Sequence, residues 1–500
     1  VLDVPIMLRT YYHTYESYAL DYVASRMLGK GKTMARKGEA KIAEIDRLFA
    51  VDKPALAAYN LNDAVLTLEI FEQAGLLADA VERSKHSGHL LDRVGGSVAA
   101  FDYLYLPRLH REGYVAGEVA DIPRPSTALP GGYVMDSKPG IYENVLLLDF
   151  KSLYPTIIKT FLIDPLGCVA PADNRVQAPV GPSFARSPTL LPHIIAELLE
   201  ARAQAKATGN QPLSQAIKIL MNSFYGVLGS TGCRFFSEEL AGAITGTGRY
   251  ILRTTCEHIE RTTGLSVIYG DTDSLFVLLG PGRQDTAVRR GGEIVLETNG
   301  WLSGHLRSRY AVESALELEQ ECHFRYFLMP TIRGSTQGSK KRYCGAIERD
   351  GRLELRFKGM ESARSDWTEL AKEFQNELYC KVFERKPVEE YIVRMVEEVK
   401  QGKMDDKLVY RKHLRKPIAQ YTGSVPPHVQ AARLLPTPPR VVYYVITREG
   451  PQPANNRSSS LDYEHYIDCQ LRPVADSVLE WVGLDFDTIV SGQQDLFGQL

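Results

Sequence analysis

The stretch Tyr269-Gly270-Asp271-Thr272-Asp273-Ser274 lies between two apolar runs, Ser266-Val267-Ile268 and Leu275-Phe276-Val277-Leu278. This pattern predicts two strands joined by a tight turn that carries two carboxylates, with Gly270 and Thr272 letting the chain turn. Two acidic side chains in one short loop repel each other unless a divalent cation neutralises them, so the turn predicts a metal site. The alternative is an acidic β-turn on a solvated surface.

A second acidic residue ends another apolar run. Val145-Leu146-Leu147-Leu148-Asp149-Phe150 has the composition of a buried strand, and Ser152-Leu153-Tyr154-Pro155 follows almost at once. A strand that delivers a carboxylate and then opens a helix places backbone N–H groups beside the metal, and such amides suit a phosphate. The alternative is that Asp149 is an ordinary strand-terminal or capping residue.

Lys218, Asn222 and Tyr225 are spaced at i, i+4 and i+7, so on a helix they share one face. A lysine charge, an amide and an aromatic ring on one face can meet a triphosphate, a sugar and a base. Arg202, in the helix-like run 194–206, adds a second cation. The alternative for each charge is simple solvation.

In order and spacing, these three segments resemble the motifs of the family B DNA polymerases. Residues 149–155 are similar to motif A, residues 218–226 to motif B and residues 269–274 to motif C. Two more segments extend the likeness: Lys340-Lys341-Arg342-Tyr343 resembles the lysine-rich primer-template motif, and Lys358-Gly359-Met360-Glu361 with Arg364, Asp366 and Trp367 resembles the segment that leads into the thumb. Residues 315–319, 328–334 and 461–466 resemble the bacterial DNA polymerase II branch.

The resemblance implies a DNA polymerase that adds deoxynucleotides to a primer 3′-hydroxyl by two-metal transfer, with a repair or translesion role. It implies two Mg²⁺ ions, for which Mn²⁺ can substitute, held by Asp149 and Asp273, with Asp271 as a weaker ligand and the Phe150 carbonyl completing the coordination. It also implies that the triphosphate is bound by several groups: Lys218, Arg202, Asn222, Tyr225 and the amides of Ser152 and Leu153. Whether Lys218 also donates a proton stays open.

Tyr154 carries a more specific prediction. An aromatic ring held under the incoming sugar leaves no room for a 2′-hydroxyl and so rejects ribonucleotides by a steric clash. The alternative is a core ring at the start of a helix.

The net charge is only −2, but the basic residues are clustered. One stretch holds Arg333, Lys340, Lys341, Arg342, Arg352, Arg356 and Lys358, and another holds Lys407, Arg411, Lys412, Arg415 and Lys416. These stretches, with Tyr343, predict a surface that grips the phosphates of a primer-template duplex, and solvated charge is the alternative.

We expect an α+β multidomain chain: a right-hand polymerase of palm, fingers and thumb, with an antiparallel palm sheet, preceded by part of an RNase H-like exonuclease domain. The expected limits are residues 1–90 for the exonuclease remnant, 91–140 for a linking segment, 141–189 and 231–365 for the palm, 190–230 for the fingers, 366–490 for the thumb and 491–500 for a tail. Helices are expected over 194–207, 214–225, 240–261, 368–383 and 388–401. The Pro- and Gly-rich segments 123–139, 171–188 and 426–453 are expected to be loops.

Both ends of the chain carry a further expectation. Residues 59–63 resemble the third motif of the family's 3′→5′ exonuclease, but no Asp-x-Glu first motif precedes them, so Tyr59 and Asp63 are predicted to be structural remnants without exonuclease activity. The chain starts at Val1, inside an expected strand over 4–8, which suggests a truncated N-terminus. Near the other end Gln493, Leu496 and Phe497 resemble a sliding-clamp-binding tail, and a frayed terminus is the alternative.

Bulk properties predict a soluble intracellular protein, and the resemblance implies a bacterial enzyme of the cytoplasm and nucleoid. The seven cysteines include no Cys-x-x-Cys pair, which disfavours zinc and disulfide frameworks. No apolar stretch reaches the roughly 18 residues of a membrane span, and no signal peptide is evident. Two rival functions remain from sequence: a reverse transcriptase or RNA polymerase, which shares acidic turns, and a non-catalytic DNA-binding relative.

Overall fold

The computed structural model describes residues 2–10, 15, 17–33, 39–93, 96–122, 131–332, 335–364 and 366–492. The chain folds into two compact units. The first unit comprises Val1–Gly132, Lys151–Ile251 and Trp301–Glu317, and the second comprises Tyr133–Phe150, Leu252–Gly300 and Leu318–Leu500. The palm, fingers and thumb limits predicted above are a finer division than this one and stay predictions.

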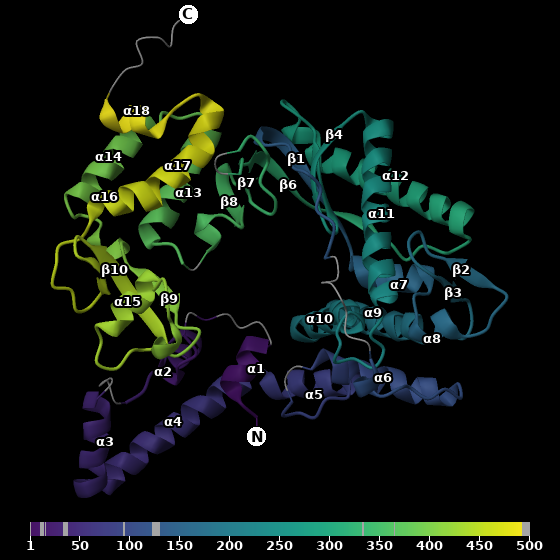
Figure 1. Cartoon of the computed structure of the whole chain (residues 1–500), viewed down its shortest axis with the longest axis horizontal. Coiled ribbons are helices and arrows are strands. Elements are labelled where there is room, and N and C mark those ends of the chain that lie inside the picture. Colours follow the sequence, from purple (N-terminus) through teal and green to yellow (C-terminus); the bar gives the residue numbers. More distant parts are fainter. Residues whose placement is uncertain are drawn as a thin grey trace, which may run out of the picture. The chain divides into compact units, whose positions relative to one another are not determined.

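An antiparallel sheet of six strands forms the centre of the second unit, in the order β4-β5-β1-β6-β7-β8 (Figure 1). Its strands are β1 (Gly140–Phe150), β4 (Ser266–Asp271), β5 (Ser274–Leu278), β6 (Leu318–Met329), β7 (Tyr343–Arg349) and β8 (Arg352–Lys358). The predicted acidic hairpin is β4-β5, and the predicted buried strand is the second half of β1. The expected antiparallel sheet is therefore confirmed.

Aromatic rings pack on one face of this sheet. The rings of Phe276 and Phe327 lie 5.0 Å apart, and the Tyr343 ring lies 5.2 Å from each of them. Gly345 in β7 makes room for Phe324, because a Cβ at Gly345 would come within 2.3 Å of that ring. Burial of these large rings is a main source of the sheet's stability.

Two helices belong to the second unit only in part, and those parts pack beside the sheet. They are α11 (Glu238–Thr263) and α12 (Ala287–Tyr310), and the boundary between the units falls inside both. Asn299 of α12 accepts from the Leu318 amide at 2.8 Å and donates to the Leu318 carbonyl at 2.9 Å, which pins α12 to the start of β6. The predicted helix over 240–261 is thus confirmed as α11.

The remainder of the second unit contains helices and a small sheet of order β11-β10-β9. The elements are α13 (Glu369–Phe383), α14 (Glu389–Lys400), β9 (Tyr410–His413), α15 (Pro427–Arg433), β10 (Val441–Thr447), β11 (Gly450–Pro453), α16 (Tyr463–Tyr466), a π-helical turn (Ile467–Leu471), α17 (Arg472–Leu479) and α18 (Phe486–Ser491). The predicted helices over 368–383 and 388–401 are confirmed as α13 and α14. They share a core with α17.

Two of the segments expected to be loops contain regular structure, so that expectation was wrong. Residues 426–453 form α15, β10 and β11, and residues 171–188 include the hairpin of β2 (Arg175–Gln177) and β3 (Ser183–Ala185). Pro427 opens α15, a position where proline costs no hydrogen bond, and β10 is the β-branched and aromatic run VVYYVIT.

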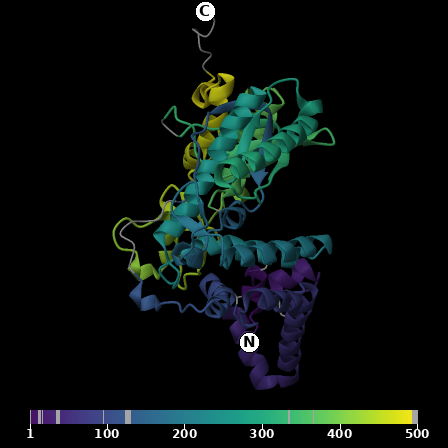
Figure 2. The same cartoon turned by 90° about the vertical axis from the view of Figure 1, so that its right-hand side faces the viewer.

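Helices dominate the first unit. They are α1 (Val4–Thr10), α2 (Leu20–Met27), α3 (Glu39–Val51), α4 (Lys53–Gln73), α5 (Leu76–Ser87), α6 (Ser97–Arg111), α7 (Leu153–Phe161), α8 (Pro165–Val169), α9 (Leu191–Ala207) and α10 (Gln211–Leu228). Figures 1 and 2 show α3 and α4 as a helical hairpin. None of the described helices combines the length and the apolar character that a bilayer crossing requires.

The predicted helix pair is confirmed as α9 and α10, and a cap explains the break between them. The Asn210 side chain accepts from the Leu213 amide at 3.1 Å, which starts α10 after a break of three residues. The α10 helix packs against α9, α6, α5 and α7, so its position is fixed from several sides.

A buried carboxylate organises this helical packing. Asp164 is fully buried, accepts from the amides of Leu166 at 3.1 Å and Leu191 at 3.2 Å, and also accepts from the Leu190 amide and the Tyr105 hydroxyl. Burial raises the pKa of Asp164, and its four donors oppose that shift. Asp164 therefore ties the start of α9 to α8 and α6.

The strand expected over residues 4–8 is wrong, because these residues begin α1. The Asp3 carboxylate accepts from the Ile6 amide at 2.8 Å, and Pro5 lies in the first turn, where its missing N–H costs nothing. The described elements between residues 2 and 93 are helices, so the sheet of an RNase H-like domain is not among them.

Candidate active site

The register of the sheet gathers the predicted carboxylates at one end of three strands. Asp149 of β1 lies opposite Ser274 of β5 on one side and Glu319 of β6 on the other. Ser274 in turn lies opposite Asp271 of β4, and the Phe150 amide donates to the Asp273 carbonyl at 2.9 Å. Directly opposed residues of an antiparallel pair project from the same face, so these acids share one edge of one sheet.

The turn that carries Asp271 and Asp273 is held by hydrogen bonds from several sides. Thr272 has a positive φ of 60°, and its amide donates to the Tyr133 carbonyl at 2.7 Å. The Thr272 hydroxyl donates to Asp271 Oδ1 at 3.1 Å. Asp271 is buried, whereas Asp149 and Asp273 are partly exposed. Their roles as metal ligands stay predictions.

Gly270 has a different role from the one predicted for it. It lies within β4 and not in the turn, and a Cβ there would come within 2.6 Å of Met135 Sδ. The Met135 amide also donates to the Gly270 carbonyl at 2.9 Å. Glycine is thus needed for the close approach of the 133–138 segment along β4, while Thr272 and Asp273 make the turn.

The donor set fits Mg²⁺ together with a phosphate substrate. Within the described residues, no group of three His, Cys, Asp or Glu side chains comes close enough to hold an ion by itself. Mg²⁺ in nucleotide enzymes is usually bound by one or two carboxylates plus the phosphates of the substrate. Asp149 and Asp273 at adjacent strand ends supply such a pair, with the Phe150 carbonyl next in the chain.

The predicted primer-template segment reaches the carboxylate hairpin. Lys341 Nζ lies 3.5 Å from Asp271 Oδ1, and the Lys341 amide donates to the Tyr269 hydroxyl at 3.0 Å. Tyr269 is fully buried, and burial raises its pKa to about 12, so the hydroxyl stays protonated near neutral pH. The Lys340 ammonium is paired with Asp136 at 3.0 Å.

The remaining predicted DNA-binding residues lie in different surroundings. Tyr343 belongs to the aromatic face of the sheet and is buried, with the Lys358 ammonium 5.9 Å from its ring centroid. Arg342 forms an ion pair with Glu361 at 2.7 Å. Lys412 of the second basic stretch pairs with Asp366 at 3.6 Å, and Arg333 lies outside the described residues. Binding of DNA by these residues stays a prediction.

Two of the predicted triphosphate ligands, Ser152 and Arg202, meet at the start of α7. Ser152 precedes α7 in the left-handed conformation, and its side chain makes no capping bond to the helix. Instead its hydroxyl accepts from Arg202 Nη1 of α9 at 3.1 Å. The structure therefore brings Ser152 and Arg202 together beside the first amide groups of a helix, a place that favours anions.

Tyr154 is held between two other helices of the first unit. Its ring centroid lies 4.8 Å from that of Tyr225 on α10, with the planes tilted by 45°. On its other side lies Gly248 of α11, where a Cβ would come within 3.2 Å of Tyr154 Cε1. Burial raises the pKa of the Tyr225 hydroxyl. The ring of Tyr154 is therefore fixed in orientation while staying partly exposed.

Lys218, Asn222 and Tyr225 share one face of α10, as predicted, and Asn222 is the most exposed of the three. Another face of α10 lines a cavity of about 240 Å³ together with α5 and the start of α6, through Leu213, Ile217 and Leu220. The predicted nucleotide ligands do not line this cavity.

The two terminal predictions have different outcomes. Asp63 of α4 pairs with Lys32 at 2.5 Å, and the Lys32 ammonium lies 5.7 Å from the Tyr59 ring centroid, an arrangement that holds these residues in a structural contact. The predicted clamp-binding residues Gln493, Leu496 and Phe497 lie outside the described residues.

A family model described as DNA polymerase family B matches residues 94–481. The chain belongs to DNA polymerase family B. DNA polymerase II of Escherichia coli is 45% identical over 515 residues, covering 99% of this chain and 65% of that protein. A DNA polymerase of Thermococcus gorgonarius is 28% identical, covering 86% of this chain and 57% of that protein. The predicted family and the likeness to its polymerase II branch are thereby confirmed.

A solved family B structure agrees with the fold. The family B DNA polymerase of Pyrobaculum calidifontis superposes with a TM-score of 0.61 at 28% identity, covering 97% of this chain and 64% of that one. The predicted polymerase fold is therefore confirmed. The chain spans less than two thirds of the length of each of these relatives.

Sequence reasoning missed three residues of this family B chain that shape the 340–342 segment. They are Gly359, Glu361 and Gln375, which are far from the acidic hairpin in sequence. Gly359 has a φ of +63°, and a Cβ there would come within 2.3 Å of the Lys341 carbonyl oxygen. The segment 358–361 was quoted for its family resemblance, and that resemblance could have drawn attention to Gly359.

We expect Gly359→Ala to destabilise the second unit by about 3 kcal/mol, because it adds a backbone collision to left-handed strain. Gly351→Ala is the matched control: Gly351 has a φ of +71° at the other end of β8 but no atom near a built Cβ, so it should cost about 1 kcal/mol from strain alone. Urea unfolding measures both. Equal losses of unfolding free energy in the two variants would show that the contact between the new Cβ and the Lys341 carbonyl is relieved without cost.

Proposed function

We propose that the chain is a template-directed DNA polymerase, adding deoxynucleotides to a primer 3′-hydroxyl. The observation that carries this proposal is the register that brings Asp149 beside the Asp271–Asp273 hairpin at one sheet edge, in a chain of DNA polymerase family B. A repair or translesion role stays a prediction from the likeness to the polymerase II branch.

Asp149 and Asp273 would hold Mg²⁺, with Mn²⁺ as a substitute and the Phe150 carbonyl as a further ligand. When bound, the ions lower the pKa of the attacking hydroxyl and stabilise the charge on the departing phosphate oxygens. Asp271, buried and bonded to the Thr272 hydroxyl, would orient the turn more than bind the ion.

The first unit would supply the ligands of the triphosphate. Arg202 and Lys218 are cations that would neutralise the leaving pyrophosphate, and Asn222 would add a neutral donor. The hydrogen bond from Arg202 to Ser152 would keep the guanidinium beside the first amides of α7 before the nucleotide arrives, which reduces the ordering needed on binding.

The second unit would also bind the primer-template duplex. The side chains of Lys340 and Lys341 are 53% and 59% exposed, enough for both ammonium groups to reach phosphates. Such contacts make the affinity fall steeply with salt.

The first test is primer extension by this chain with Mg²⁺ and deoxynucleotides. We expect Asp149→Asn and Asp273→Asn each to lower the rate by at least about 10³-fold, because each removes a charge that the ions need. Asp285→Asn is the control, since this acid is exposed and lies in the short helical turn Gln284–Thr286, outside the hairpin. Full extension by either active-site variant would refute the metal assignment, and extension on RNA templates alone would favour an RNA-templated enzyme.

Tyr154→Ala should raise the incorporation of ribonucleotides relative to deoxynucleotides by about 10-fold to 100-fold, because the ring that excludes the 2′-hydroxyl is gone. Tyr154→Phe keeps the ring and loses only the hydroxyl, so it should still reject ribonucleotides. Single-nucleotide incorporation assays with matched pairs of nucleotides measure both. A Tyr154→Ala variant as selective as the parent would show that the Tyr154 ring does not exclude ribonucleotides.

We also propose that the tail binds a sliding clamp through Gln493, Leu496 and Phe497. A triple alanine variant at these positions should lose capture by an immobilised bacterial clamp while keeping unassisted extension, because two apolar anchors and an amide are lost. Gln494→Ala with Asp495→Ala is the control within the same tail. If the immobilised clamp still captures the triple variant, the clamp-binding site lies elsewhere in the chain.

A further inference from the structure

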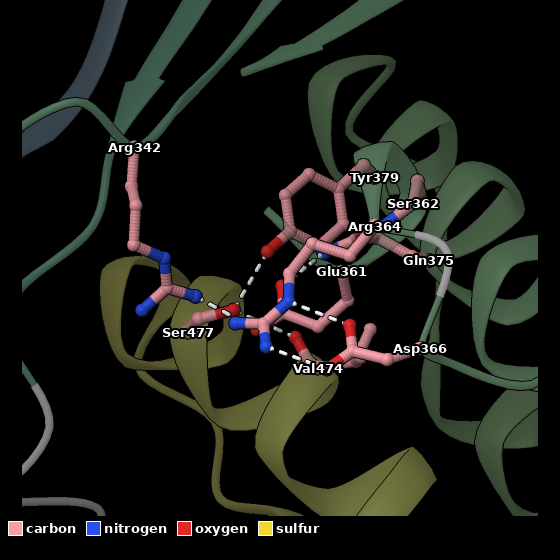
Figure 3. A network of polar contacts seen from close by, with 9 residues as sticks. All are labelled: Arg342, Glu361, Ser362, Arg364, Asp366, Gln375, Tyr379, Val474 and Ser477. Carbon is pink, nitrogen blue, oxygen red and sulfur yellow. Dashed lines mark hydrogen bonds and ion pairs between the residues drawn. The ribbon is translucent and has the colours of Figure 1, made fainter. Parts of the chain in front are cut away.

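Arg342 differs from the two lysines that precede it. Its side chain is 25% exposed, whereas those of Lys340 and Lys341 are more than half exposed. Its Nη2 donates to Glu361 Oε1 at 2.7 Å, and the side chain of Glu361 is only 3% exposed. The guanidinium therefore points toward a buried carboxylate; Figure 3 shows it directed at the other labelled side chains of the cluster.

The second oxygen of Glu361 is also engaged. Gln375 Nε2 of α13 donates to Glu361 Oε2 at 2.9 Å, and Gln375 is fully buried. The Gln375 carbonyl oxygen accepts from the Ser362 amide at 2.7 Å and from the Ser362 hydroxyl at 2.5 Å. Arg342, Glu361, Gln375 and Ser362 thus form one continuous polar network, which we call the Glu361 network (Figure 3).

The negative charge of Glu361 holds the Arg342 guanidinium in this network. A buried carboxylate that loses a hydrogen-bonded cation is destabilised, because it was desolvated on folding and water does not replace the lost donor. Arg342 forms an ion pair with Glu361, and the Arg364 guanidinium also interacts electrostatically with this carboxylate. Moving the guanidinium onto a DNA phosphate would break its 2.7 Å hydrogen bond to a buried carboxylate, so the ion pair is the favoured state.

The segment 340–342 is also held on its other side. The Lys341 amide donates to the Tyr269 hydroxyl of β4, and the Lys341 carbonyl packs against Gly359. The segment is thereby fixed between the hairpin that carries Asp271 and the helix α13 that carries Gln375. Its backbone position is set by these contacts, and the two lysines project from it.

We infer that Arg342 and Glu361 are positioning residues: they hold Lys340 and Lys341 in place for DNA phosphates, and Arg342 itself does not contact a phosphate. This inference rests on the proposed function, because it concerns how the chain binds a primer-template. It changes the role predicted for Arg342 from its place in the lysine-rich motif.

The two roles of Arg342 predict opposite effects when Glu361 loses its charge. If Arg342 were a phosphate contact restrained by Glu361, then Glu361→Gln would release a cation and DNA would bind equally well or more tightly. If Arg342 positions the segment, Glu361→Gln should weaken binding by about tenfold, because two buried hydrogen bonds lose their charged acceptor. The second result is unusual for the removal of a negative charge from a DNA-binding protein.

The sequence offers a rescue that keeps the composition unchanged. In Glu361→Gln, the new amide faces the amide of Gln375, so two donors oppose each other. Adding Gln375→Glu restores the pattern: Gln at 361 accepts from Arg342 and donates to Glu at 375, whose other oxygen accepts from Ser362. We expect this swapped pair to recover most of the parent affinity.

Fluorescence anisotropy with a labelled primer-template, at several salt concentrations, tests the inference. Glu361→Gln should bind about tenfold more weakly with the parent's salt dependence, and the swap should restore the affinity. Lys341→Gln should flatten the plot of log Kd against log salt by about 0.9, the amount for one lost phosphate contact. Thermal unfolding of each variant separates these effects from misfolding, since a purely structural role lowers the folded fraction without changing the Kd of folded molecules.

The outcomes separate the two proposals. A parent chain that binds no primer-template overturns the proposed function and this inference with it. Binding by the parent, with Glu361→Gln as tight as the parent or tighter, overturns only the inference. A swapped pair that does not fold, or that folds without regaining affinity, overturns it as well, because the hydrogen-bond pattern would then not be what holds the segment.

Discussion

The antiparallel register of β1 against β5 and β6 is the constraint on which the rest of the site depends. Side chains alternate with a period of two, so a slip by one residue would turn Asp149 to the other face of the sheet. The register between β1 and β6 shifts between Leu147 and Leu148, and without that irregularity Asp149 would lie opposite Gln320 in place of Glu319. Such irregularities commonly redirect a side chain next to an active site.

Charge balance around this edge follows from burial. Two buried acids of the second unit each lie beside a cation of the basic motif: Asp271 beside Lys341, and Glu361 beside Arg342. Asp149 and Asp273 are the more exposed acids of the hairpin and the strand beside it. Because a buried acid without a cation is unfavourable, the basic motif after the hairpin contributes to the stability of the fold as well as to the surface offered to DNA.

Close packing against neighbouring segments explains three glycines in the second unit. Gly270 admits Met135, Gly345 admits the ring of Phe324, and Gly359 admits the Lys341 carbonyl. In each case a side chain would push apart segments that are distant in sequence. Only Gly359 combines this with a positive φ, which makes it the most constrained of the three.

The sequence by itself determined the features that depend on local pattern. Apolar runs predicted β1 and the β4-β5 hairpin, helical spacing predicted α9, α10, α11, α13 and α14, and the motifs predicted family B. Local pattern gave wrong predictions where two signals competed. The proline content of residues 426–453 predicted a loop although this segment contains the β-branched strand β10. The apolar run at residues 4–8 predicted a strand although these residues form the helix that Asp3 caps. Tertiary structure alone decided the register that aligns Asp149 with Ser274, the role of Gly270 and the pairing of Arg342 with Glu361. The physical reason is that each depends on contacts between segments far apart in the chain, for which periodicity and composition carry no information.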